Sequence, residues 1–213
     1  AERLAIARLN LQAGEKAKWA AANQSAFKFF VAGLSFLLPV GSVTTESADV
    51  LDPGAAAFAT DYDLSLSLTG RAAESAYLLA DFPSMDRLAD SALKNARSWQ
   101  DKVEIYQVRI NALTAQNRLL DAIQAAREIL EPLGVRLPLK PGQAEVDEAL
   151  REVDQALQGR SFASLLAIPQ APAGAAHHGV LRILDSIHAT TAMTLQSLGP
   201  IVAAKMVQLT IMH

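Results

Sequence analysis

Small residues at helical spacing constrain this chain more than any other feature of its sequence. Ala26, Phe30, Gly33 and Leu37 recur at the spacing of one face of an α-helix, and Gly14 lies in the helical pattern before them. Glycine inside a helix costs about 1 kcal/mol relative to alanine, so two helical glycines need a packing reason. The sequence therefore predicts two helices that approach each other closely at Gly14 and Gly33.

Two further helix pairs follow, over residues 61–99 and 103–130. Pro83 suits the first turn of a helix, and Gly134 is the expected C-terminal cap of the second helix of the third pair. Between Asp63 and Leu68 leucines alternate with polar residues, as in a strand, but the Ala-rich continuation favours a helix. We expect nine residues to pack the helix pairs: Gly14, Ala26, Phe30, Gly33, Ala80, Ala89, Ala92, Ala122 and Ala126.

The first pair resembles the tetratricopeptide repeat. In that repeat the first helix has a small residue midway, the second helix has an aromatic residue between two small residues, and a proline follows the second helix. Gly14, Ala26, Phe30, Gly33 and Pro39 occupy those places, with Pro39 one residue late. The expected fold is all-α, a right-handed array of antiparallel helix pairs, a tetratricopeptide-like α-α superhelix of about nine to eleven helices.

Two regions are expected along the chain. Residues 1–139 hold the helix pairs, interrupted by an exposed loop at 40–60, where Gly, Ser, Thr, Asp and Pro replace the helical period. Residues 140–213 form a divergent helical part, truncated but continuous with the same array. In that part we expect an amphipathic helix with Val146, Leu150, Val153 and Leu157 on its apolar face, and Ser161 as the N-cap of a short helix. A linker is expected at 169–174. The last helix, apolar almost all round, should pack on a neighbour that this piece lacks.

The composition supports a folded core and excludes several classes of site. Hydrophobic residues make up 51% of the chain and charged residues 19%, and the net charge of -3 gives no reason to expect nucleic-acid binding. Cysteine is absent, which excludes disulfides, thiolate catalysis and cysteine-bound zinc, and favours the cytoplasm. The apolar stretch at 27–43 is too interrupted to cross a membrane.

No catalytic, cofactor-binding or metal-binding residue is expected. A phosphate-binding Gly-rich loop is absent, and His177 and His178 are adjacent, so they point about 100° apart on a helix and cannot share a metal. His188 with Asp185 and Ser186 leaves a hydrolase site as the least favoured alternative.

Five conspicuous side chains are candidates for contact with a partner protein. Trp19 and Trp99 are candidate anchors of a partner, although core packing is the commoner use of tryptophan. Gln107, Arg109 and Asn111 are candidate polar contacts on the first helix of the third pair.

Three runs of the sequence resemble a known region of larger proteins. They cover residues 9–37, 72–138 and 181–213, with the segments from Gly159 to Pro169 and "KMVQLTI" at Lys205 to Ile211 as the most specific parts. These runs are similar to the tetratricopeptide-like helical spacer of large bacterial multidomain signalling ATPases and kinases. In that family a Ser/Thr-kinase-like domain and an AAA-type ATPase precede the spacer, and a GAF sensor with a histidine kinase or cyclase follows it.

The resemblance implies a spacer without catalytic residues, inside a protein that has kinase or ATPase activity elsewhere. The chain starts at Ala1 and stops within an apolar run, which also suggests a piece of a longer protein. We therefore expect a non-catalytic scaffold or regulatory segment of a signal-transduction protein, whose partners are flanking domains of the same chain. A free-standing adaptor that captures a peptide of another protein is the alternative. The oligomeric state is left open.

Overall fold

The computed structural model of the chain describes residues 2–39, 51–168 and 176–212. Those ranges contain eleven α-helices, one short 3-10 helix and no strand, so the all-α prediction is confirmed there. The internal contacts divide the chain into two compact units, Ala1–Ala112 and Leu113–His213. The division falls within a helix, whereas the sequence suggested a boundary near residue 139.

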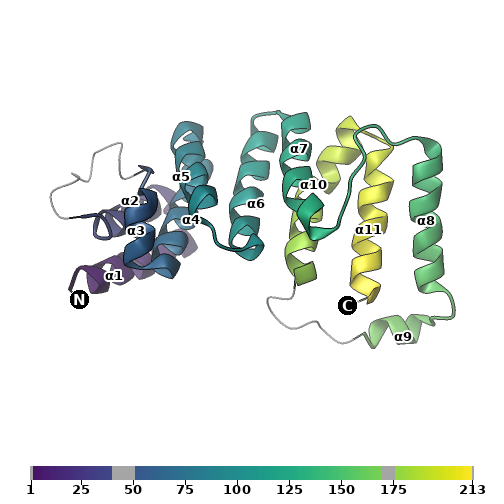
Figure 1. The fold of residues 1–213 in the computed structure, drawn as a ribbon, viewed down its shortest axis with the longest axis horizontal. Helices are drawn as coiled ribbons and strands as arrows, with labels where there is room; N and C mark the ends of the chain where they lie inside the picture. Colours follow the sequence, from purple (N-terminus) through teal and green to yellow (C-terminus); the bar gives the residue numbers. More distant parts are fainter. Residues whose placement is uncertain (1, 40–50, 169–175, 213) are drawn as a thin grey trace. The chain divides into compact units, whose positions relative to one another are not determined.

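The first unit is built from helices packed in pairs (Figure 1). Helix α1 (Glu2–Trp19) packs on α2 (Asn23–Ser35), α4 (Tyr62–Leu78) packs on α5 (Phe82–Asn95), and α2 joins the two pairs by packing on α4. Helix α6 (Trp99–Ala115) starts in this unit. The hydrophobic core of this unit contains the large buried side chains of Phe30, Leu34, Leu68, Met85 and Leu88.

The same tight turn ends the first helix of each expected pair. Ala21, Ala80 and Asn117 each adopt a left-handed backbone, with φ of 55°, 57° and 59°. In each turn this residue donates its N–H to the carbonyl three residues earlier, and the next residue donates to the carbonyl five residues earlier, at 2.8 to 2.9 Å. This double hydrogen bond is the Schellman motif, which satisfies the last carbonyls of a helix. The next helix then begins one residue later.

Counting from the left-handed residue of each turn, the same four positions are buried in all three cases. Seven residues before it lie Gly14, Ala73 and Ile110, and five residues after it lie Ala26, Met85 and Ala122. Nine residues after it lie Phe30, Ala89 and Ala126, and twelve residues after it lie Gly33, Ala92 and Ile129. Eight of the nine expected packing residues are in this set. Ala80 is the exception, and that prediction was wrong. Ala80 is the exposed left-handed residue of the turn after α4, because that helix ends at Leu78.

The expected loop at 40–60 is partly helical. Residues 40–50 lie outside the described residues, but α3 (Gly54–Thr60) is a helix that packs on α4 and α5. The Ser65 hydroxyl, buried in α4, donates to the Ala57 carbonyl of α3 at 2.7 Å. This contact also explains the strand-like alternation near Leu64. Ser65 is polar but buried, so neighbours on several sides cover α4 and hide the helical period of its apolar residues.

The second unit does not follow chain order. It contains α7 (Leu119–Leu130), a 3-10 helix (Glu131–Leu133), α8 (Gln143–Leu157), α9 (Phe162–Leu166), α10 (Ala176–Thr194) and α11 (Leu198–Met212). Helix α10 packs on α7 and α11, and α8 packs on the other side of α11, so the order in space is α7, α10, α11, α8 (Figure 1).

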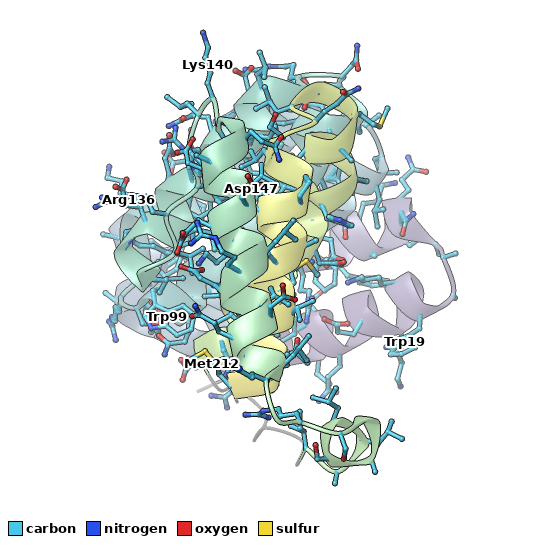
Figure 2. All side chains as sticks on the ribbon, turned by 90° about the vertical axis from the view of Figure 1, so that its right-hand side faces the viewer. Trp19, Trp99, Arg136, Lys140, Asp147 and Met212 are labelled. Atoms are coloured by element: carbon cyan, nitrogen blue, oxygen red, sulfur yellow. The ribbon has the colours of Figure 1, made fainter. Side chains whose placement is uncertain are left out.

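This order corrects two expectations. The apolar α11 finds its neighbours, α8 and α10, within the chain. Leu150 was expected on the apolar face of α8, but its side chain is 47% exposed, while Val146 and Ala149 are buried. The outward face of α8 carries charged residues such as Asp147 (Figure 2), as expected of the polar outer surface that ends a helical stack.

Several helix ends are fixed as the sequence suggested. Gly134 is left-handed, with φ of 79°, and the Ser161 hydroxyl accepts the Ser164 N–H at 3.1 Å as an N-cap. The expected linker at 169–174 lies outside the described residues. Among the described helices, none is long and apolar enough to span a membrane.

Candidate partner-binding face

Ion pairs join α1 to α4, each of which is the first helix of its pair. These ion pairs define one edge of the first unit. From α1 to α4, Arg8 Nη2 lies 3.1 Å from Asp61 Oδ2, Glu15 Oε1 lies 2.8 Å from Arg71 Nε, and Lys18 Nζ lies 2.5 Å from Glu74 Oε2. The partner numbers rise together, so α1 and α4 run parallel. Helix α1 therefore lies beside α4, the first helix of the next pair, as well as beside its own partner α2.

Arg71 stands at the centre of this edge. Its Nη1 also lies 3.3 Å from Glu74 Oε2, and it is close enough to Glu104 of α6 for an electrostatic interaction. Burial alone would lower the pKa of Arg71, but the carboxylates of Glu15, Glu104 and Glu74 outweigh it and raise the pKa. One guanidinium thus interacts with carboxylates of all three first helices.

A second contact fixes the start of α6 against the start of α4. The Tyr62 hydroxyl donates to Asp101 Oδ2 at 2.6 Å, and Asp101 also accepts the Ser98 N–H at 2.9 Å. The Arg97 guanidinium covers the Tyr62 ring at 3.9 Å from its centroid. Burial raises the pKa of Tyr62, and its hydrogen bond to Asp101 adds to that rise. Asp101 serves both as a cap of α6 and as its bridge to α4.

Apolar side chains lie at the turn end of the same edge. Trp19 is 89% exposed, and Figure 2 shows its ring extending away from the end of α1. Leu78 of α4 is 46% exposed and holds the equivalent position, two residues before the left-handed residue of its turn. Trp19 follows Glu15 by four residues and Leu78 follows Glu74 by four, so each lies on the same side of its helix as the ion pairs.

These residues define one surface, the charged face. It comprises Glu15, Lys18 and Trp19 of α1, Arg71, Glu74 and Leu78 of α4, and Glu104, Gln107 and Asn111 of α6. Gln107 and Asn111 belong to it because they follow Glu104 by three and seven residues on one side of α6. Both are half-buried.

The other expected contact residues lie elsewhere. Arg109 pairs with Asp90 of α5, so its guanidinium is directed to the second helix of the preceding pair. Trp99 is half-buried at the first residue of α6. Of the five expected contact residues, the charged face contains Trp19, Gln107 and Asn111.

The charged residues of this face were not predicted, although the sequence contains a signal for them. Glu15, Glu74 and Asn111 all lie six residues before the left-handed residue of their turns. Aligning the three pairs on their turns would have shown polar residues recurring at that position. This signal is weak because only Asn117 is a residue type common in left-handed backbone, whereas Ala21 and Ala80 are alanines that do not mark a turn.

The residues considered for catalysis do not assemble into a site. His188 and Asp185 are exposed on α10, and the Ser186 hydroxyl donates to the Arg182 carbonyl of its own helix at 2.8 Å. Without a hydrogen bond from Ser186 to His188, this segment lacks the geometry of a nucleophile activated by a base. In the part of the chain that the structure describes, no group of His, Asp and Glu side chains could hold a metal ion.

Comparisons with known proteins do not place the chain in a family. No protein-family model matches it, and neither the curated proteins nor the solved structures include a match.

Proposed function

We propose that this chain is a non-catalytic helical-repeat scaffold that binds a protein partner through the charged face of α1, α4 and α6. The observation that carries the proposal is Trp19, which is 89% exposed at the end of a row of interhelical ion pairs. A tryptophan in water leaves a large apolar surface uncovered, and such residues dominate the binding energy of protein interfaces.

Within the first unit, the proposal includes a tetratricopeptide-like arrangement of α1 and α2, α4 and α5, and α6, with the right-handed sense expected for that repeat. Support comes from the repeated Schellman turns, the equivalent buried positions and the parallel first helices. In such arrays adjacent repeats offer an extended surface to a partner.

The proposal also carries the setting expected from the sequence. The partner is either a flanking domain of a larger signalling protein, as the resemblance of residues 9–37 and 72–138 implies, or a separate protein. The absence of cysteine supports a cytoplasmic setting.

Site-specific photocrosslinking tests this function. The full chain is expressed in its source cells with a photoreactive amino acid in place of Trp19 or Gln107 on the charged face, or of Leu150 on α8 as a control. The exposure of Leu150, at 47%, lies between that of the half-buried Gln107 and that of Trp19. We expect one defined protein or flanking domain to be crosslinked from both positions of the face and not from Leu150. Equal products from all three positions, or none from the face, would reject the proposal. An intramolecular product identifies a flanking domain, and an intermolecular one an adaptor.

A further inference from the structure

Uncharged residues are exposed where the chain turns after α1 and after α4. Because α1 and α4 run parallel, continuing both helices past the Lys18–Glu74 ion pair brings the two turns side by side. Their exposed residues define the turn patch: Trp19, Ala20, Ala21, Ala22, Leu78, Leu79 and Ala80. Trp19 is 89% exposed, Leu78 46% and Leu79 40%, so the three large side chains of the turn patch are all open to solvent.

The charged groups beside the turn patch already interact within the chain. Lys18 pairs with Glu74, and Glu15 pairs with Arg71. Glu104 interacts with Arg71 and has a further interaction. Because each of these charges has a partner, they select neither a cationic nor an anionic segment. The surface left uncovered at this end of the charged face is apolar.

The backbone of the turn patch also offers little to a polar partner. The N–H groups of Ala21 and Ala22 donate to carbonyls of α1, and the N–H of Ala80 donates to a carbonyl of α4, all at 2.9 Å. These donors are already used, so a partner gains contact here through apolar side chains.

The residue type at the left-handed positions favours the same interpretation. Ala21 and Ala80 hold φ of 55° and 57°, a conformation in which alanine is disfavoured relative to glycine or asparagine. The equivalent turn after α6 has the polar residues Gln116, Asn117 and Arg118. Residues that break a local preference are expected at functional sites, so the two alanine turns indicate that their apolar surface is used.

The surroundings of the turn patch suit a protein segment better than a lipid surface. Lys18, Glu74 and Asp81, the N-cap of α5, border it. A bilayer that covered the turn patch would have to dehydrate these charges. A protein interface has an apolar centre and a polar rim that stays in water, which matches this arrangement.

We propose that a partner protein covers the turn patch with an uncharged apolar segment, whose leucine or aromatic side chains pack on Trp19, Leu78 and Leu79. This inference rests on the proposed function and specifies the chemistry of the partner.

Binding of defined peptides to the full chain tests it. The probes are three fluorescein-labelled glycine-serine peptides of one length, with leucines, lysines or glutamates at the same positions. Fluorescence anisotropy gives Kd at low and high salt. We expect saturable binding of the leucine peptide that salt changes by less than about twofold, and at least about tenfold weaker binding of the charged peptides. No saturable binding of the leucine peptide, or equal affinity for a charged peptide, would overturn the inference.

Substitutions on and off the turn patch locate the binding. Trp19→Ala, and separately the double variant Leu78→Gln with Leu79→Gln, should raise the Kd for the leucine peptide by about tenfold. Leu166→Ala in α9 changes another exposed apolar residue, and Glu15→Gln removes a charge of the charged face; both should leave the Kd within about twofold. Circular dichroism and thermal melting verify that each variant is folded. A loss in either control equal to that of Trp19→Ala would contradict the proposed site.

Phosphatidylcholine vesicles test the lipid alternative. Trp99→Phe leaves Trp19 as the only tryptophan, so its emission reports on the turn patch. The vesicles should leave this emission unchanged, and the natural protein should not sediment with them. A blue shift, or cosedimentation of the natural protein, would show that lipid covers the turn patch and would overturn the inference.

The outcome is separable from that of the crosslinking experiment. If the photoreactive residue in place of Trp19 captures a partner through a charged segment, the scaffold function stands and the apolar specificity is wrong. If neither face position crosslinks a partner, the function itself is rejected.

Discussion

The Phe30 ring fills the space beside the Gly14 backbone so closely that a Cβ at Gly14 would lie 2.3 Å from Phe30 Cε1. In the second helix pair the equivalent residues are Ala73 and Ala89. Two small side chains therefore occupy the positions that a glycine and a large aromatic ring occupy in the first pair. The first pair packs a large side chain against a glycine, and the second pair packs two alanines.

Gly14→Ala should therefore destabilise the protein in spite of the better helix propensity of alanine. The new methyl group overpacks a fully buried ring, which typically costs about 1–3 kcal/mol and exceeds the gain of about 1 kcal/mol in helix propensity. Urea denaturation followed by circular dichroism measures the change.

The control is Gly70→Ala, also within a helix. Its Cβ would lie 3.1 Å from the terminal Cδ1 of Ile105, which can shift by a rotation of the side chain. We expect Gly70→Ala to be at least as stable as the natural protein. Phe30→Leu should recover part of the loss when combined with Gly14→Ala. If Gly14→Ala is the more stable of the two glycine variants, the packing argument is wrong.

Ala80→Gly should stabilise the protein. Ala80 holds a left-handed backbone with φ of 57°, which costs an alanine roughly 1 kcal/mol and a glycine almost nothing. The greater flexibility of glycine in the unfolded chain offsets part of this, which leaves an expected gain of about 0.5 kcal/mol in the free energy of unfolding. Ala115→Gly, in the last turn of α6, is the control and should lower stability.

Asp101 should make stability depend on pH in the acid range. Burial acts to raise its pKa, but hydrogen bonds from Tyr62, Ser98 and the Arg97 N–H together lower it. A lowered carboxyl pKa contributes stability above the unfolded value of about 3.9, and this contribution is lost as pH falls through the folded value. The natural protein should exceed Asp101→Asn by about 1–2 kcal/mol at neutral pH, with the difference shrinking below about pH 4.

Urea denaturation at a series of pH values measures this difference, and Tyr62→Phe provides the comparison. Removing the Tyr62 hydroxyl takes away one donor to Asp101, so the acid-range loss of stability should be smaller in that variant. An unchanged difference between pH 7 and pH 3 would show that Asp101 does not act through its charge.

On α8 a smaller truncation should cost more than a larger one. Val146 is buried against the rest of the second unit, so Val146→Ala should destabilise the protein by about 1–2 kcal/mol. Leu150 is 47% exposed, and Leu150→Ala should change the free energy of unfolding by no more than about 0.5 kcal/mol. Thermal melting of both variants decides the question, and a larger loss for Leu150→Ala would place that residue in the interface.

Local sequence signals were sufficient to predict most helices. They were not sufficient to predict which helices pack on one another. Pro83, Gly134 and Ser161 mark helix ends through backbone chemistry that the sequence displays directly. The packing order of the second unit depends on which apolar stripe finds which partner, and sequence periodicity does not carry that information. Leu150 illustrates the limit, because it has the spacing expected of a buried residue but its side chain is 47% exposed.

The charged face was partly predictable for a similar reason. Three residues that the sequence suggested as partner contacts, Trp19, Gln107 and Asn111, belong to this face. Glu15 and Arg71 have no distinctive neighbours in the sequence, since their pairing joins residues 56 positions apart only after α1 and α4 lie parallel. Such pairs are a product of tertiary packing and leave no local trace.

The out-of-order packing of the second unit also affects its synthesis. Glu152 of α8 contacts Lys205 and Gln208 of α11, which lie 53 and 56 residues later in the chain. During translation α8 therefore leaves the ribosome well before the helix that covers its apolar side, while α10 can dock on α7 as soon as it emerges. During folding from the N-terminus, α8 would be the last helix to pack. Its charged outer surface would help to prevent aggregation before α11 is synthesised.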